Sequence, residues 1–230
     1  LLGMATKSIS DAIKSNYYSI RPEDFHGLIP KLTVKVGDKI SAGDTVFFDK
    51  SNDLIKITSP ISGEVIEISR GEKRRILEIK IKADKKIKFK SYDKLDLANA
   101  SAEKIKARLL ESGCWPFLKQ RPYDIIASPD SLPKAIFISA HASAPLAVDY
   151  NFTLQSKKQE LQAALTAISK LTDGEVHVGV LKGSKSPFMK LQNIMLHNVS
   201  GPHPSGNVGT LINKIDPINK GETVWTINPQ

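Results

Sequence analysis

Five histidines and one cysteine are the side chains of this sequence best suited to bind a metal or move a proton near neutral pH. The histidines stand at positions 26, 141, 177, 197 and 203 and form neither an H-x3-H nor an H-E-x-x-H motif. The single cysteine, Cys114, excludes four-cysteine zinc and iron–sulfur sites made by this chain alone. Beside Trp115, Cys114 is expected to be a small core residue. The sequence therefore predicts no metal site and no catalytic residue.

The loop from Gly201 to Gly209 combines glycines and prolines around His203. It is neither a G-x-G-x-x-G nor a Walker A motif, and its two prolines lack the N–H groups that would hold a phosphate. One interpretation is a rigid turn that leads the chain back to a β-domain formed by the N-terminal part of the sequence. The other places His203 on a loop facing a ligand or a partner, where it could donate a hydrogen bond or take up a proton.

A second loop, Ser139–Ser143, follows the apolar run 135–139, which has the pattern of a strand buried on both faces. In open α/β sheets, ligands bind beyond the carboxyl ends of the strands. This loop, with His141 at its centre, is therefore a pocket candidate, and Ala144–Leu146 is its expected apolar wall. The alternative is a packed strand exit without a ligand.

The elements that must position these residues fall into two groups. Short runs of alternating apolar residues between glycine turns, over 30–83, predict a small all-β sandwich or barrel. After a charged linker, Ser101 is expected to cap a helix that ends at Gly113. Residues 115–133 contain four prolines and are expected to be irregular.

The remaining segments alternate between strand and helix patterns. The sequence predicts strands at 135–139, 175–181, 194–199, 210–215 and 223–227 and a helix over 156–171, with His177 on one face of its strand. We expect a mixed α+β protein with three parts: a β-domain over 1–84, a small α/β domain with its linker over 85–200, and a Gly/Pro turn over 201–230 whose strands return to the β-domain.

The chain of 230 residues carries 33 Lys and Arg against 24 Asp and Glu, a net charge of +9. Ten basic residues fall between Arg70 and Lys90 with only three acidic ones. Such a patch could meet anionic lipid, an acidic protein or nucleic acid, or form a solvated strand face. Nucleic acid is the weaker alternative because only 7% of residues are aromatic and no strand motif interleaves aromatic with basic residues. No apolar run approaches the ~18 residues of a membrane span.

Two stretches of the β-domain resemble the biotinyl/lipoyl-carrier barrel-sandwich hybrid. Val34–Asp44 reads V-x-V-G-D-x-I-x-A-G-D, and Ile57–Val65 reads I-x-S-P-x-x-G-x-V. Carriers of this type have a modified lysine six residues before the position of Pro60, where this sequence has Leu54. The resemblance therefore implies the carrier fold without its modification site, and a carrier-like binding module remains an alternative function.

Four wider features resemble the NqrA family, one of the subunits of the bacterial sodium-translocating NADH:quinone reductase, and more distantly the electron-transport subunit RnfC. They cover nearly the whole chain, and the Gly-Pro-His-Pro stretch is the most specific of them. The four are Ile20–Gly27, Ser112–Trp115 with Arg121-Pro122, Pro133–Ala140 with Ala144–Ala147, and Gly201–Thr210 with Val224–Ile227. Members of that family are longer, so the resemblance implies a fragment that lacks their C-terminal region.

The resemblance implies a peripheral subunit on the cytoplasmic face of the bacterial inner membrane. The complex reduces quinone with electrons from NADH and exports sodium. The subunit would contribute to quinone binding or assembly, with quinone as substrate and no tightly bound cofactor of its own. Its implied partners are the other subunits, quinone and an anionic membrane surface, but not nucleic acid.

A quinone ring is planar and uncharged, and it requires apolar or aromatic walls and one or two hydrogen-bond donors. The candidates for such contacts are Arg21, Phe25, His26, His141 and His203. We expect the first three to join Trp115 and Phe117 in one pocket.

Overall fold

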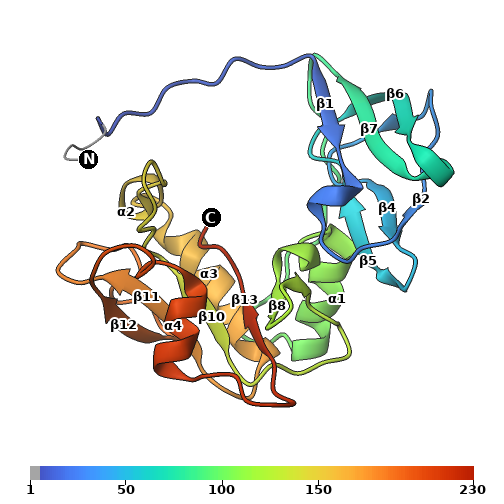
Figure 1. Cartoon of the computed structure of the whole chain (residues 1–230). Coiled ribbons are helices and arrows are strands. Elements are labelled where there is room, and N and C mark those ends of the chain that lie inside the picture. Colours follow the sequence, from blue (N-terminus) through green and yellow to red (C-terminus); the bar gives the residue numbers. More distant parts are fainter. Residues whose placement is uncertain (1–5) are drawn as a thin grey trace.

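The computed structural model describes residues 6–230, so the first five residues of the expected β-domain lie outside it. Two lobes are joined through helix α1 (Figure 1). Within residues 6–230, no helix is long and apolar enough to cross a membrane. The sequence-based expectation of a barrel-sandwich β-domain followed by an α/β domain is confirmed.

The β-domain is built from two sheets that face one apolar core. One sheet has the strand order β1-β7-β6-β3, and the other has the order β2-β4-β5. Their bounds are β1 Tyr17–Ile20, β2 Pro30–Leu32, β3 Lys39–Ile40, β4 Thr45–Asp49, β5 Asn52–Thr58, β6 Gly63–Arg70 and β7 Ile76–Ala83. The predicted alternation holds in β7, where Ile79 and Ile81 are fully buried while Lys82 is exposed. Strand β1, which the sequence analysis missed, pairs antiparallel with β7.

The second lobe contains one six-stranded sheet, ordered β12-β11-β10-β13-β8-β9. Its strands are β8 Lys119–Arg121, β9 Ile125–Ile126, β10 Ile136–Ser139, β11 Val176–Leu181, β12 Met195–Val199 and β13 Val224–Thr226. The helices are α1 Ala102–Ser112, α2 Tyr150–Thr153, α3 Lys158–Ile168 and α4 Val208–Ile215. Strands β12, β11, β10 and β13 run parallel, and β8 and β9 are antiparallel additions.

The central strands of this sheet are buried on both faces. Ile136 and Ile138 of β10 pack into the larger core, to which α1 and α3 contribute. Ala135 and Phe137 point to the opposite face, where Leu211 and Ile212 of α4 cover them. The expected start of α1 is confirmed, because the Ser101 hydroxyl accepts a hydrogen bond from the Lys104 amide at 3.4 Å. The expected end is confirmed by Gly113, which is left-handed.

Three expectations about the second lobe are wrong. Residues 210–215 form part of helix α4 rather than a strand, because the apolar spacing of Val208, Leu211, Ile212 and Ile215 follows a helical period and covers the sheet. The last strand, β13, does not return to the β-domain but pairs with β10 and β8. The proline-rich stretch 115–133 contributes β8 and β9 instead of remaining irregular.

The lobes share apolar contacts. Ile55 of β5 belongs to the core of the second lobe, and Phe25 and Leu28 pack against the cores of both lobes. Trp115 is fully buried, with its indole Nε1 donating to the Ala127 carbonyl at 2.7 Å. Cys114 is exposed, so the expectation of a core cysteine is wrong: the chain leaves α1 at Gly113, and the next side chain inward is Trp115.

Candidate functional site

The two loops that the sequence analysis singled out meet at the carboxyl edge of the six-stranded sheet. The Ser139 hydroxyl donates to the Gly206 carbonyl at 2.7 Å, and the Gly206 amide donates to the Ser143 hydroxyl at 2.8 Å. The approach is close enough that a Cβ on Gly206 would lie 2.4 Å from the His141 carbonyl oxygen. Loop 201–209 therefore connects β12 to α4 rather than leading back to the β-domain. We call its hydrogen-bonded contact with loop 139–143 the loop clamp.

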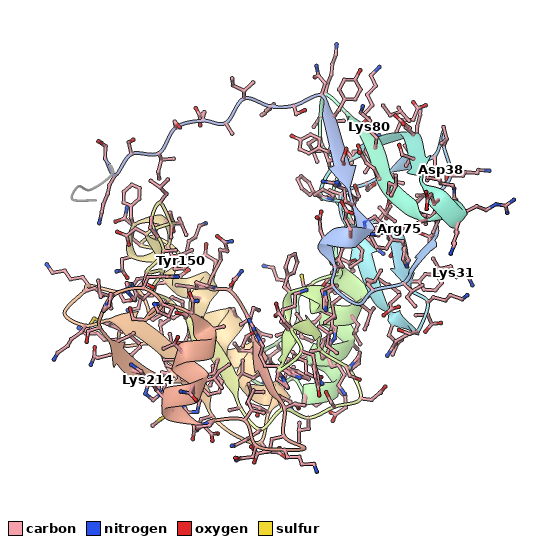
Figure 2. The ribbon with its side chains drawn as sticks, in the orientation of Figure 1. Lys31, Asp38, Arg75, Lys80, Tyr150 and Lys214 are labelled. Atoms are coloured by element: carbon pink, nitrogen blue, oxygen red, sulfur yellow. The ribbon has the colours of Figure 1, made fainter. Side chains whose placement is uncertain are left out.

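A cavity of about 860 Å³ opens beside these loops. Its walls come from β8, β10, β13, the two loops, α2 and the first turn of α4. The lining residues are Phe117, Lys119, Arg121, Asp124, Ser139, His141, Ala142, Tyr150 (labelled in Figure 2), Pro204, Gly206, Asn207, Val208, Gly209, Thr210, Thr226, Ile227, Asn228 and Gln230. The pocket expected after Ser139 is thus present. Its expected wall at Ala144–Leu146 is wrong, because Leu146 is fully exposed and lines no part of the cavity.

Two basic side chains enter the cavity because of the register of β8. In the antiparallel pairing with β13, Lys119 lies opposite Thr226 and Arg121 lies opposite Val224. Paired residues project to the same face of a sheet, and Val224 packs with α4. Lys119 and Arg121 therefore project to the face that α4 covers, while Gln120 between them projects to the other.

The electrostatic environment of these two cations differs. Burial lowers the pKa of Lys119, and the Asp124 carboxylate opposes that effect. Lys119 makes no ion pair within residues 6–230. Arg121 pairs with Asp124 at 3.3 Å through Nη2, while its Nε is buried without a hydrogen-bond partner.

His141 is the candidate histidine that lines the cavity. Burial lowers its pKa, with a smaller opposing effect from Asp149, so its imidazole is neutral near pH 7. The Ser139 hydroxyl donates to the His141 carbonyl oxygen at 3.0 Å and helps fix the loop. A neutral imidazole offers one N–H donor and one acceptor.

The other candidates do not gather with His141. His203 is exposed, and its Nδ1 lies 3.1 Å from the Ser143 hydroxyl. Arg21 pairs with Glu23 at 2.5 Å in the β-domain, and Phe25 packs edge-on against Phe47.

The pocket expected from Arg21, Phe25 and His26 with Trp115 and Phe117 does not form. His26 lines a separate cavity of about 370 Å³ between the lobes. Trp115 lies in the core of the second lobe, and Phe117 lines the large cavity instead.

Two further histidines lie together away from the cavity. His177 Nδ1 lies 3.0 Å from His197 Nε2 on neighbouring strands, which confirms His177 as a strand residue. Burial lowers the pKa of both, and for His177 the charge of His197 lowers it further. No group of three or more His, Cys, Asp or Glu side chains within residues 6–230 is arranged to hold a metal.

The sequence analysis missed Lys119, Arg121 and the start of α4. The basic pair lay in a stretch expected to be irregular. The helix start, Val208-Gly209, lay at the end of the loop 201–209, just before the segment 210–215 that was interpreted as a strand. A readable signal was present, because Asn207 is a favourable helix cap and the apolar residues after it have helical spacing.

Comparisons with known proteins match both lobes of the chain. Residues 1–84 match the NqrA N-terminal barrel-sandwich hybrid domain, and residues 100–230 match the NqrA second alpha/beta domain. Three similar proteins are NqrA subunits of Na(+)-translocating NADH-quinone reductases. They come from Saccharophagus degradans (36% identical), Neisseria meningitidis serogroup B (34%) and Glaesserella parasuis (32%); each match covers all of this chain and 52% of the relative.

The chain thus spans about half the length of the curated relatives it matches. Both of its lobes have a counterpart in the family, in the same order. On these matches, the chain belongs to the NqrA family.

Proposed function

We propose that the chain acts as part of a peripheral subunit of a sodium-translocating NADH:quinone reductase, at the cytoplasmic face of the membrane. The observation that carries the proposal is the family match of both lobes, together with the names of the relatives. The chain would support quinone binding or assembly with other subunits, and electrons would be carried elsewhere in the complex.

The purified chain tests this role directly. We expect a colourless protein that does not oxidise NADH alone, but that co-purifies with the membrane subunits of its complex when they are co-expressed. A tightly bound flavin, or NADH oxidation by the chain alone, would contradict the proposal. Failure to co-purify when every other subunit is present would contradict the assembly role.

We place the quinone contact at His141 in the large cavity. The exposed ring of Phe117 and the ring of Tyr150 line the same cavity and supply apolar surface, and the neutral imidazole supplies a donor for a quinone carbonyl. The cavity is of the size that small-molecule sites usually have. The other four candidates lie outside its lining.

Titration calorimetry with a short-chain, water-soluble quinone tests this placement. Removing one neutral hydrogen bond costs about 1 kcal/mol, so His141→Leu, which leaves no side-chain donor, should weaken binding roughly fivefold to tenfold. His26→Leu is the matched control, because His26 lines the cavity between the lobes. If the His26 variant binds the quinone more weakly and the His141 variant binds it as the wild type does, the site lies in the cavity between the lobes.

The basic patch of the β-domain is the surface we propose for contact with anionic lipid. Backbone hydrogen bonds hold residues 88–90 against Ala42, from the Ala42 amide to the Lys88 carbonyl at 2.9 Å and from the Lys90 amide to the Ala42 carbonyl at 2.8 Å. Phe89 between them is 75% exposed. The exposed basic side chains of this lobe include Lys85, Lys86, Lys88, Lys90 and Arg75 (labelled in Figure 2). A rigidly held aromatic ring among lysines suits an anionic headgroup layer.

Sedimentation with phosphatidylglycerol vesicles and with neutral phosphatidylcholine vesicles tests this contact. Burying a phenylalanine contributes roughly 1.5–3 kcal/mol, so Phe89→Ala should weaken binding to anionic vesicles at least tenfold. Lys214→Gln, in the other lobe, is the control and should leave binding unchanged. Absence of vesicle binding at low salt, with binding to an acidic subunit instead, would assign the patch to a protein partner.

A further inference from the structure

The large cavity has a cationic side that an uncharged quinone does not explain. Lys119 and Arg121 project into it from β8, and Asp124 is the one carboxylate side chain in its lining. Lys119 is half-buried and has no ion-pair partner within residues 6–230. The buried Nε of Arg121 also has no acceptor. A protein normally leaves a buried donor such as this Nε without an acceptor only where a ligand or water satisfies it.

The first turn of α4 adds neutral donors to the same side. The Asn207 side chain makes no capping hydrogen bond, so the amide of Gly209, at the second position of the helix, lacks that acceptor, while the Thr210 amide donates to the Asn207 carbonyl at 3.0 Å. Gly209 has open space where a Cβ would stand, so its backbone can be approached closely. Val208, Gly209 and Thr210 all line the cavity. A helix start favours negative charge near its N–H groups.

The prolines of loop 201–209 do not remove these donors. Pro202 and Pro204 precede the helix, and the residues of its first turn that line the cavity come after Asn207. The sequence argument against a phosphate-holding loop applies to the loop itself. It does not apply to the start of helix α4 at Val208, of which the sequence analysis interpreted residues 210–215 as a strand.

We propose that this side of the cavity binds the phosphoryl group of a small ligand, held by Lys119, Arg121 and the first turn of α4. The guanidinium supplies planar donors, the ammonium a mobile charge, and the amides directed neutral donors. The cavity is larger than a phosphate ion needs, so the phosphoryl group can belong to an organic molecule. This site goes beyond the proposed quinone contact and does not rest on it.

Titration calorimetry of the whole chain at constant ionic strength tests the proposal with two probes, inorganic phosphate and adenosine monophosphate. We expect saturable binding of at least one probe. Tighter binding of the nucleotide would identify a phosphorylated organic ligand, and equal binding would identify free phosphate. No saturable binding of either probe would overturn the proposal.

Matched variants separate the site from general charge attraction. Losing a charge-assisted hydrogen bond costs at least about 1.4 kcal/mol, so Lys119→Gln should weaken binding tenfold or more, while Lys119→Arg should largely preserve it. Lys214→Gln removes the same charge at the opposite end of α4, where Figure 2 labels Lys214, and should have no effect.

Arg121→Gln provides a second test if Lys119→Gln does not fold. Equal weakening in the site variants and in Lys214→Gln would overturn the proposal. Such a failure is separable from that of the quinone contact, because the quinone is uncharged and its test uses His141.

Discussion

Replacing Gly206 with alanine tests whether the two loops close the cavity as the structure describes. The new Cβ would lie 2.4 Å from the His141 carbonyl oxygen and 2.6 Å from the Ser143 nitrogen. Both neighbours are backbone atoms, so neither can move without shifting its loop. The hydrogen bonds from the Ser139 hydroxyl and to the Ser143 hydroxyl would be lost or lengthened.

The size of the effect follows from these contacts. Two neutral hydrogen bonds contribute about 1 kcal/mol each, and forced overpacking costs about 1–3 kcal/mol. Alanine also restricts the unfolded chain, which returns roughly 0.4–1 kcal/mol. The free energy of unfolding of Gly206→Ala should therefore fall by about 2–5 kcal/mol.

Urea unfolding followed by tryptophan fluorescence measures this change in the right lobe, because Trp115 and Trp225 both lie there. The control is Gly209→Ala, where a Cβ would meet nothing within 4 Å. Alanine is favoured over glycine in helices by up to about 1 kcal/mol, so the control should be as stable as the wild type or slightly more stable. Coincident unfolding midpoints for Gly206→Ala and the wild type would refute the loop clamp.

Two further predictions concern the same lobe. Ser101→Ala should lower the free energy of unfolding by about 1 kcal/mol, because it removes the side-chain cap of α1. Urea unfolding measures this change, and an unchanged midpoint would contradict a stabilising cap. His177 and His197 have pKa values lowered by burial, so the unfolded chain takes up their protons first and stability should fall as the pH drops through about 6.5. The variant His197→Gln removes one titrating group, and it also removes the charge of His197 that lowers the pKa of His177. Its urea midpoint should therefore depend less on pH over that range than the wild-type midpoint does. An equal pH dependence would contradict the pairing.

The parts of the fold that sequence predicted best are those with long, uniform patterns. Strand β7 alternates fully buried isoleucines with charged residues, and α3 carries its three buried residues, Leu161, Leu165 and Ile168, on one stripe. The missed strands β1, β8 and β9 are two to four residues long, too short for a period to emerge. Their strand conformation depends on the neighbours with which they pair.

The interpretation of residues 210–215 as a strand shows a different difficulty. Thr210, Ile212 and Ile215 are β-branched and favour strands locally, while the spacing of Val208, Leu211, Ile212 and Ile215 favours a helix. The structure follows the spacing, because a helix buries Leu211 and Ile212 together against Phe137. A strand would place these two consecutive residues on opposite faces.

The charge of the cavity depends on strand register more than on any loop. Gln120, between Lys119 and Arg121, accepts hydrogen bonds through its side-chain oxygen from the Ser128 amide at 3.3 Å and the Ser131 hydroxyl at 3.1 Å. Those contacts hold Gln120 on the face opposite α4. Because side chains alternate with a period of two, they also keep both basic residues on the α4 face. A slip of β8 by one residue would turn the side chains of Lys119, Gln120 and Arg121 to the opposite faces of the sheet. The cationic side of the cavity is therefore a consequence of strand pairing, which motif searches along the chain do not detect.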